Sequence, residues 1–273
     1  MVCDIAEKHR ICTEGLRDFA ASAGFTDVVI GLSGGIDSSV VACLCAEVFG
    51  SAHVHGYLLP GPYSSEHSIT DAQVLGNALG IVCERVSIVD AFESFERALA
   101  PHCHGHVFQG LAAENTQARC RMIVLMALSN EYGWMLVNTG NKSESCMGYS
   151  TLYGDTSGAY APIGGLYKTD VYEMARYINA QAEACGSRAP IPEHVLTKPP
   201  SAELAPNQID EATLGSYAVL DAILIDHVER KMDEGQLIAA GHDPEDVRRI
   251  VARNAAFAFK RALEPEYPPI PYA

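Results

Sequence analysis

The sequence predicts an α/β fold in which a parallel sheet is flanked by helices and followed by a helical C-terminal part. Apolar, β-branched runs alternate with amphipathic segments over roughly the first 180 residues. Such alternation is typical of parallel strands joined by helical crossovers. A proline-rich break at residues 189–208 separates this part from a final stretch with a helical pattern. We expect a single domain over residues 1–273.

The elements are expected in the following order. Strands are predicted at residues 27–32, 53–59, 81–88 and 134–138. Helices are predicted where apolar residues recur every three to four positions, at residues 4–23, 37–49, 65–79, 108–132 and 165–180. Residues 189–208 hold five of the fourteen prolines and form a long loop, which is more often functional than idle. Residues 211–263 are expected to be helical, with an extended tail after them.

Composition limits the classes of function. The net charge is −15 and no Lys/Arg run is present, which argues against a nucleic-acid surface. No apolar run approaches the roughly 18–20 residues of a membrane-spanning helix, and the N-terminus mixes both charge signs, unlike a signal peptide. Nine cysteines, an odd number, are expected to be reduced thiols in a cytoplasmic protein.

The stretch "GLSGGIDSS" lies where the first strand ends and a helix begins. In an open α/β sheet this edge binds ligands, and glycines followed by helix amides favour an oxyanion such as phosphate. A Walker A lysine and a GxGxxG pattern are both absent. Asp37 beside phosphates implies a bridging Mg²⁺, although the alternative, a helix N-cap, is about as common for aspartate. The expected phosphate ligands are Gly31, Leu32, Ser33, Gly34, Gly35, Ile36, Asp37 and Ser38.

"SGGIDSS" resembles the loop of the N-type ATP pyrophosphatases, which hold the β,γ-pyrophosphate of ATP as a leaving group. Three further segments resemble the NAD synthetases within that superfamily: "ENTQARCRM" (114–122), "TGNKSESCMGYSTLYGDTSGAYAPIGGLYKT" (139–169) and "PSAELAPNQIDEATLGSY" (200–217). The resemblance covers residues 10–265. It implies a Rossmann-like sheet of the adenine nucleotide alpha-hydrolase type.

The resemblance assigns residues to ATP and Mg²⁺. Asp37 and Glu144 match the two carboxylates that bind the metal, and Thr139, Lys168 and Ser201 match positions that contact ATP. Ser201 lies in the proline-rich loop, which would act as a lid. Taken alone, Glu144 could be an ordinary acidic residue at a helix N-terminus, and Lys168 an ordinary solvated lysine.

The second substrate implied is deamido-NAD. Arg119, Asp155, Phe259 and Lys260 match positions that hold it, although Asp155 could instead serve the turn in which it lies. The implied reaction proceeds in two steps: the nicotinate carboxylate attacks the α-phosphorus of ATP, and ammonia then displaces AMP. We expect Asp37, Lys168 and Asp155 to be catalytic, and the family implies a homodimer with deamido-NAD bound across the interface.

Leu152 departs from the pattern. Many ammonia-dependent members have lysine three positions before the aspartate of the YGD turn, where it meets deamido-NAD. The leucine here either changes how that end of the substrate is held or points to the glutamine-dependent group, which "FAFKR" near the C-terminus also favours. Those enzymes carry an N-terminal amidase domain. Because this sequence starts at the synthetase, we expect free ammonia, or ammonia from a separate glutaminase, as the nitrogen donor.

Other readings are weaker. "HCHGH" (102–106) has spacing that suits zinc on a strand, but it lies between helices without a completing ligand set, so a polar loop is expected. Another adenylating ligase, such as a GMP synthetase or a tRNA-modifying enzyme, is the nearest alternative function. A non-catalytic nucleotide-binding subunit is a third possibility, against which the retained carboxylates and Lys168 argue.

Overall fold

The computed structural model describes residues 3–272 and is built around a parallel sheet. Its strands are β1 (Val28–Gly31), β2 (Val54–Leu58), β3 (Val82–Arg85) and β4 (Met135–Leu136), in the order β3-β2-β1-β4. The predicted parallel sheet is therefore confirmed. Because the strand order reverses between β1 and β4, their carboxyl ends diverge into a crevice where α/β proteins bind ligands.

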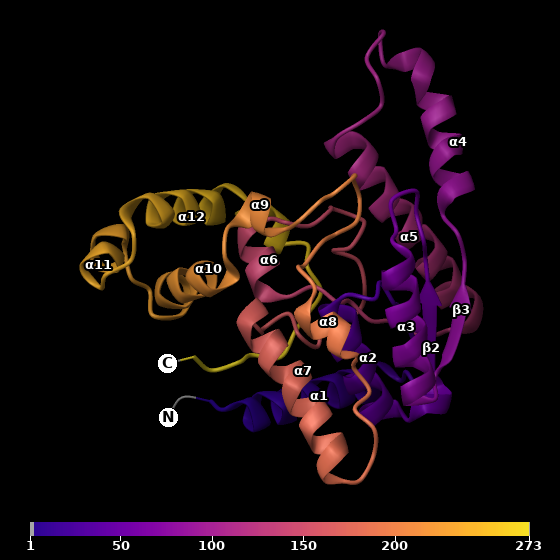
Figure 1. The fold of residues 1–273 in the computed structure, drawn as a ribbon, viewed down its shortest axis with the longest axis horizontal. Coiled ribbons are helices and arrows are strands. Elements are labelled where there is room, and N and C mark those ends of the chain that lie inside the picture. The colour runs from indigo at the N-terminus through magenta and orange to yellow at the C-terminus, as the bar shows by residue number, and fades with distance from the viewer. Residues whose placement is uncertain (1–2, 273) are drawn as a thin grey trace.

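Helices cover both faces of the sheet (Figure 1). One face packs against α1 (Ile5–Ala23), α2 (Ile36–Phe49), α3 (Glu66–Leu79) and α7 (Lys168–Ala184). The other packs against α4 (Val89–Leu99) and α5 (Leu111–Tyr132). Alternation along β1 produces the two cores, since Val28 and Ile30 belong to the first and Val29 to the second.

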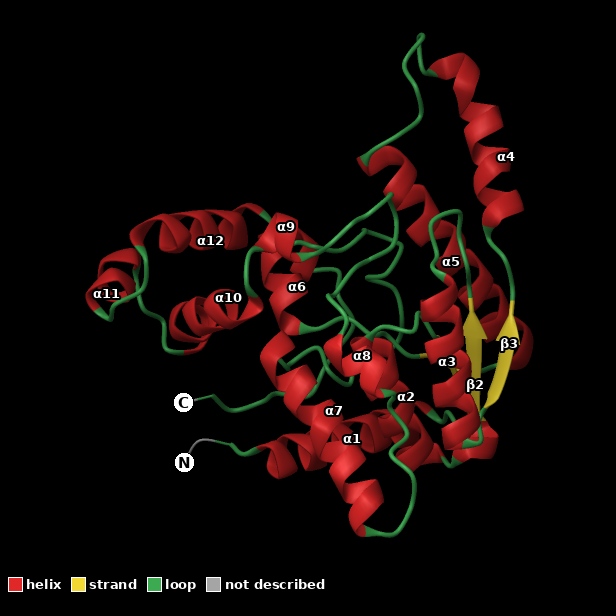
Figure 2. Cartoon of the chain, viewed as in Figure 1, coloured by secondary structure: helices red, strands yellow, loops and turns green. Residues whose placement is uncertain are grey.

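The C-terminal part forms a helical appendage, as predicted, on the side of α6 and α7 away from β2 and β3 (Figure 2). It consists of short helices, α9 (Glu211–Leu214), α10 (Tyr217–Leu224), α11 (Glu234–Ala239), α12 (Pro244–Ala256) and α13 (Ala258–Arg261), with a π turn at Ile225–Glu229. The segment 189–208 is not wholly a loop, because α8 (Glu193–Thr197) interrupts it.

Several expected boundaries change. Helix α4 was not predicted, and neither was α6 (Lys142–Met147), which is too short for a periodic pattern. Strand β4 has two residues rather than five, because Val137 already pairs with Tyr160 in an isolated bridge. Within the predicted polar loop at residues 102–106, His102 ends the 3₁₀ turn Ala100–His102 and the next residues form a turn. A second 3₁₀ turn, Ser51–His53, precedes β2.

The extended tail packs against the first turn of α7. The hydroxyl of Tyr272 donates to Asp170 and, at 3.1 Å, to the carbonyl oxygen of Gly165. Lys8, from α1, reaches the same aspartate at 2.7 Å. Segments near both ends of the chain therefore support the turn that begins at Lys168. Among residues 3–272, no helix has both the length and the apolar composition needed to cross a membrane.

Candidate active site

The loop between β1 and α2 has the geometry of an anion site. Gly35 is the N-cap of α2, so the first amides of this 14-residue helix face the loop. Gly34 has φ +74°, and a Cβ there would lie 2.1 Å from the carbonyl oxygen of Ser68. Only glycine fits both demands. Ser38 Oγ donates to the Gly35 carbonyl at 3.1 Å and keeps the loop compact.

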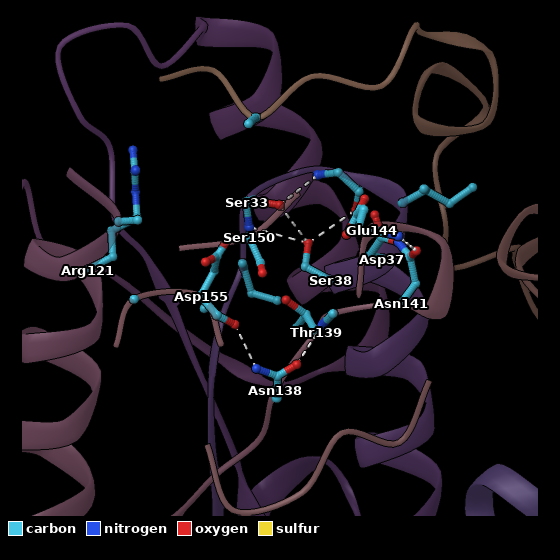
Figure 3. Close-up of a pocket in the computed structure, with 18 of the residues that line it drawn as sticks. Ser33, Asp37, Ser38, Arg121, Asn138, Thr139, Asn141, Glu144, Ser150 and Asp155 are labelled. Carbon is cyan, nitrogen blue, oxygen red and sulfur yellow. Dashed lines mark hydrogen bonds between the residues drawn. The ribbon is translucent and has the colours of Figure 1, made fainter. Parts of the chain in front are cut away.

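A cavity of about 360 Å³ opens beside this loop at the carboxyl ends of β1, β2 and β4 (Figure 3). Its walls come from the phosphate loop, residues 57–60 at the end of β2, the middle of α5, residues 136–141, the start of α7 and residues 198–204 of the proline-rich segment. Segments predicted separately along the chain therefore meet around one space.

Two carboxylates and one lysine meet in this cavity. Lys168 Nζ lies 2.6 Å from Asp37 Oδ2 and 2.9 Å from Glu144 Oε1, and its side chain is only 2% exposed. Burial alone would lower the pKa of Lys168, but the two carboxylates outweigh burial and raise it. For Glu144, burial raises the pKa more than Lys168 lowers it. Lys168 therefore stays protonated between the two carboxyl groups.

Asn141 organises this cluster. Its Nδ2 donates to Asp37 Oδ1 at 2.8 Å, while its Oδ1 accepts the Glu144 amide at 3.1 Å as the N-cap of α6. One side chain thus fixes both carboxylate-bearing segments. Asn141 was not predicted as a site residue, although an asparagine directly before "KSE" is a typical N-cap signal.

The carboxylates of Asp37 and Glu144 suit Mg²⁺. Both converge on the same point, marked by the ammonium group of Lys168. Mg²⁺ is commonly held by one or two carboxylates, with water and substrate phosphates completing its coordination. Among residues 3–272, no group of three or more His, Cys, Asp or Glu side chains is placed to hold a metal by itself. The pair fits an ion that arrives with a polyphosphate better than a protein-only site such as structural zinc.

Asp155 lies in another part of the cavity wall. Its backbone oxygen accepts from Asn138 Nδ2 at 2.7 Å, and its carboxylate accepts the Thr151 amide. The residue is exposed to solvent along the cavity, yet the protein packed around its carboxyl group raises the pKa of Asp155 to about 6, although hydrogen bonds from backbone amides oppose this. Thr139, next to Asn138, also lines the cavity.

The sequence profile described as NAD synthase matches residues 9–264. The chain belongs to the NAD synthase family.

Relatives support this assignment. The chain is 43% identical over 255 residues to a glutamine-dependent NAD(+) synthetase of Thermotoga maritima, an alignment that covers 91% of this chain and 43% of the relative. It spans less than half the length of the curated relatives it matches. The similarity to the glutamine-dependent group, which Leu152 indicated, is thereby confirmed.

Solved structures agree on the fold. A structure of NMN synthetase from Francisella tularensis superposes with a TM-score of 0.77 at 29% identity, covering 94% of this chain and 96% of that one. An NH3-dependent NAD synthetase from Campylobacter jejuni gives a TM-score of 0.73 at 26% identity, with coverage of 94% and 96%. The adenine nucleotide alpha-hydrolase-like architecture expected from the sequence is thus shared with NAD synthetases.

Some residues that family resemblance assigned to the second substrate lie outside the cavity. Arg119 Nε donates to the Leu152 carbonyl at 3.1 Å, Lys260 Nζ donates to the carbonyls of Gly148 and Ser150, and Phe259 is 57% exposed. Their role toward deamido-NAD stays a prediction. Arg121, two positions beyond Arg119, does line the cavity, because residues two apart on a helix point in different directions.

The proline-rich segment forms one wall of the cavity and is held by hydrogen bonds within the segment and to α5. Ser201 Oγ donates to the Gln208 carbonyl at 2.6 Å and accepts the Glu203 amide at 3.1 Å. Gln117 of α5 donates to the Leu204 carbonyl at 2.9 Å. These hydrogen bonds hold Ser201 in place at the wall of the cavity.

Asp210 is a further carboxylate of the cavity wall that sequence reasoning did not single out. Its carboxylate accepts from the Tyr149 hydroxyl at 3.0 Å, and its amide donates to the Pro200 carbonyl at 3.0 Å. Burial raises the pKa of Asp210, while Lys168 lowers it. The cavity therefore has more anionic than cationic groups around Lys168, an arrangement that favours a divalent cation.

Proposed function

We propose that this chain amidates deamido-NAD to NAD with ATP and Mg²⁺, as an ammonia-dependent ligase. The observation that carries the proposal is the meeting of the "SGGIDSS" loop with Asp37, Glu144 and Lys168 at one cavity of an NAD synthase family member. Because the chain spans less than half of its curated relatives, their activity is a proposal for it rather than a property carried over.

ATP would lie with its phosphates at the N-terminus of α2. This end of the cavity is surrounded by residues 31–38 other than Gly34, together with Thr139 and Ser201. Gly34 instead lets the loop pack against Ser68. Asp37 and Glu144 would hold Mg²⁺, which, when bound, screens the charge of the departing pyrophosphate. Lys168 holds the two carboxylates together and neutralises part of their charge.

The proposed chemistry needs positioning and electrostatics but no nucleophilic side chain. The nicotinate carboxylate attacks the α-phosphorus, the bond to the β,γ-pyrophosphate breaks, and an acyl adenylate forms. Ammonia then attacks the acyl carbon and AMP leaves. Asp155 is suited to accept the proton lost by the attacking nitrogen, since its pKa of about 6 lies close to neutral pH.

The second substrate would approach from the side where Arg119, Phe259 and Lys260 lie. We propose that a second copy of the chain completes this site. Large apolar side chains are exposed on α5 and near the C-terminus, among them Leu111, Ile123, Phe259 and Leu263 at 51–72%, and such surfaces often pair in homodimers. The expectation of a cytoplasmic homodimer stays part of this proposal.

The nitrogen donor divides the similar proteins. The curated relatives are named glutamine-dependent, whereas the C. jejuni protein, 96% of which is covered, is named NH3-dependent. We propose ammonia, either free or delivered by a separate glutaminase. Ammonium and glutamine are supplied to the purified protein in separate reactions. NAD formation with ammonium but not with glutamine is expected, whereas formation with glutamine alone would indicate direct use of glutamine.

The decisive assay combines the protein with ATP, Mg²⁺, ammonium and deamido-NAD and measures NAD, AMP and pyrophosphate. Equimolar formation of the three products is expected. Absence of NAD and pyrophosphate would refute the proposal, and activity with xanthylate would favour the GMP synthetase alternative.

A second candidate substrate is nicotinate mononucleotide. The F. tularensis protein that superposes with a TM-score of 0.77 along nearly its whole length is named an NMN synthetase. Running the assay with nicotinate mononucleotide beside deamido-NAD compares the two, and the higher kcat/KM identifies the substrate.

A further inference from the structure

The cavity has three cationic lining residues among those described, Arg121, Lys168 and Lys198. The phosphate loop itself has no lysine. Lys168 seemed from the sequence to be the replacement, but its ammonium group is enclosed by two carboxylates at 2.6 and 2.9 Å. Its charge is therefore already compensated before any phosphate arrives.

Arg121 is poorly placed for the phosphates. Its Nε is held by the Leu59 carbonyl at 2.9 Å. In Figure 3 it stands on the opposite side of the cavity from Asp37, Glu144 and Asn141. This leaves Lys198, which follows α8 in the proline-rich segment.

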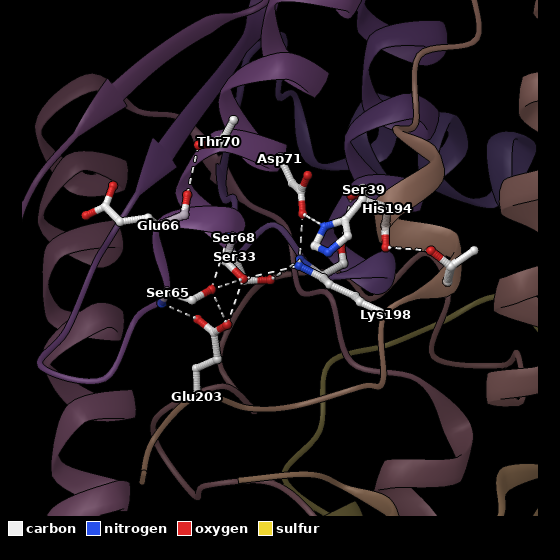
Figure 4. A network of polar contacts seen from close by, with 12 residues as sticks. Ser33, Ser39, Ser65, Glu66, Ser68, Thr70, Asp71, His194, Lys198 and Glu203 are labelled. Carbon is white, nitrogen blue, oxygen red and sulfur yellow. Dashed lines mark hydrogen bonds and ion pairs between the residues drawn. The ribbon is translucent and has the colours of Figure 1, made fainter. Parts of the chain in front are cut away.

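Lys198 reaches toward the phosphate loop (Figure 4). Its Nζ lies 3.2 Å from Ser68 Oγ and 3.2 Å from Asp71 Oδ2. The carbonyl of this same Ser68 is the group that a Cβ on Gly34 would meet at 2.1 Å, so Ser68 packs directly on the loop. One residue thus separates the ammonium group from the backbone that would cradle phosphate.

We propose that Lys198 supplies the positive charge that the phosphate loop lacks, by binding the β- or γ-phosphate of the nucleotide. This inference rests on the proposed function and adds a binding residue to it. A lysine on a flexible stem can move its ammonium group to a phosphate oxygen while its backbone stays in place.

Asp71, the carboxylate that Lys198 would leave, keeps a second partner. Asp71 Oδ2 also lies 2.8 Å from His194 Nδ1. The carboxylate keeps this histidine as a hydrogen-bond partner when the lysine turns to the phosphate. Asp71 and the incoming phosphate therefore compete for Lys198.

Two variants separate phosphate binding from a purely structural role. Lys198→Met removes the charge, whereas Asp71→Asn removes only the competing carboxylate. Lys231→Met, at an exposed lysine of the C-terminal part, is the matched control for loss of one charge. Dissociation constants for ATP and for adenosine are measured by titration calorimetry with Mg²⁺ present, and folding is checked by circular dichroism.

Lys198→Met is expected to weaken ATP binding by about tenfold or more, since charge-assisted hydrogen bonds are among the strong ones. Adenosine binding should be unchanged. Asp71→Asn should bind ATP as well as the wild type or more tightly, and Lys231→Met should match the wild type. If Lys198→Met does not fold, Lys198→Gln, which removes the charge but keeps a hydrogen-bond donor on the side chain, takes its place.

Unchanged ATP affinity in the folded Lys198 variant would overturn the proposal. So would an Asp71→Asn variant as weak as Lys198→Met, because the lysine would then act only through its ion pair. If the wild type binds no ATP, the proposed function itself fails. If the wild type binds ATP and makes NAD but the Lys198 variant is unaffected, only this inference fails.

Discussion

The ammonium group of Lys168 lies 2.6 Å from Oδ2 of Asp37, although the residues are 131 positions apart in the chain. Asp37 is fixed on the first turn of α2 and Lys168 on the first turn of α7. The contact joins two of the helix N-termini that border the cavity. Its consequences for stability and turnover can be measured separately.

Asp37→Asn and Glu144→Gln are each expected to reduce NAD formation by roughly 100-fold or more, because each removes one of the charges proposed to organise Mg²⁺. The fold should survive, since amide side chains fill the same space. The measurement is kcat as a function of Mg²⁺ concentration. Glu173→Gln, on the exposed side of α7, is the control and should behave as the wild type. An unchanged Mg²⁺ dependence in either variant contradicts that ligand.

Lys168→Met is expected to destabilise the protein by about 3–5 kcal/mol at neutral pH, because breaking a buried ion pair leaves uncompensated charge. The loss should shrink on acidification. Burial already raises the pKa of Glu144, and removing the lysine raises it further. A carboxyl group with a raised folded-state pKa lowers stability above that pKa, and the penalty disappears as pH falls and the group takes up a proton.

Urea unfolding of Lys168→Met and wild type at pH 8 and pH 5 tests this dependence. The difference in free energy of unfolding should be larger at pH 8. A difference that is equal at both pH values would show that lost packing, rather than charge, causes the effect.

Asp155→Asn should stabilise the protein above pH 6 while reducing turnover. The protein packed around the carboxyl group raises the folded-state pKa of Asp155 to about 6, so ionisation of this group costs stability that asparagine does not lose. The gain should be absent near pH 4, where the wild-type carboxyl group is protonated in the folded state. Thermal unfolding across pH 4–8 provides the measurement, and a stabilisation independent of pH would refute the charge explanation.

Gly34→Ala is expected to cost more stability than Gly24→Ala. Both glycines have positive φ, +74° and +78°, which costs about 1–2 kcal/mol for alanine. Only Gly34 also has backbone within the space of a Cβ, at 2.1 Å, whereas nothing lies within 4 Å at Gly24. ATP affinity should fall only in the Gly34 variant. Equal melting temperatures for the two variants would mean that α3 can move away from the loop.

The sequence allowed the sheet and the carboxylate cluster to be anticipated for different reasons. Most of the predicted range 27–32 forms a strand, β1 at Val28–Gly31, because a continuous apolar run fits burial on both faces. Asp37 and Glu144 were found through motifs, and their proximity follows from strands whose carboxyl ends share one edge. Periodicity could not reveal α6, with its six residues, or the shortening of β4 by the bridge to Tyr160.

Other features depended on contacts that no local pattern encodes. Whether Arg119 or Arg121 faces the cavity is decided by how α5 rotates against the sheet. Two contacts join segments that are 24–131 residues apart in the chain: Lys168 pairs with both carboxylates, and Lys198 approaches Ser68. Long-range placement of charged groups was therefore the part that sequence alone left open.

Tyr272 and Lys8, which lie near the two ends of the described residues, both contact Asp170 in the first turn of α7. The position of Lys168 therefore depends on segments far from the cavity in the sequence. Trimming a handful of residues from the far end, a routine step in preparing proteins for crystallisation, would remove the tyrosine that braces this turn. A shortened version could keep every residue of the cavity and still lose the alignment of its lysine. The tail thus contributes to positioning a residue of the candidate active site.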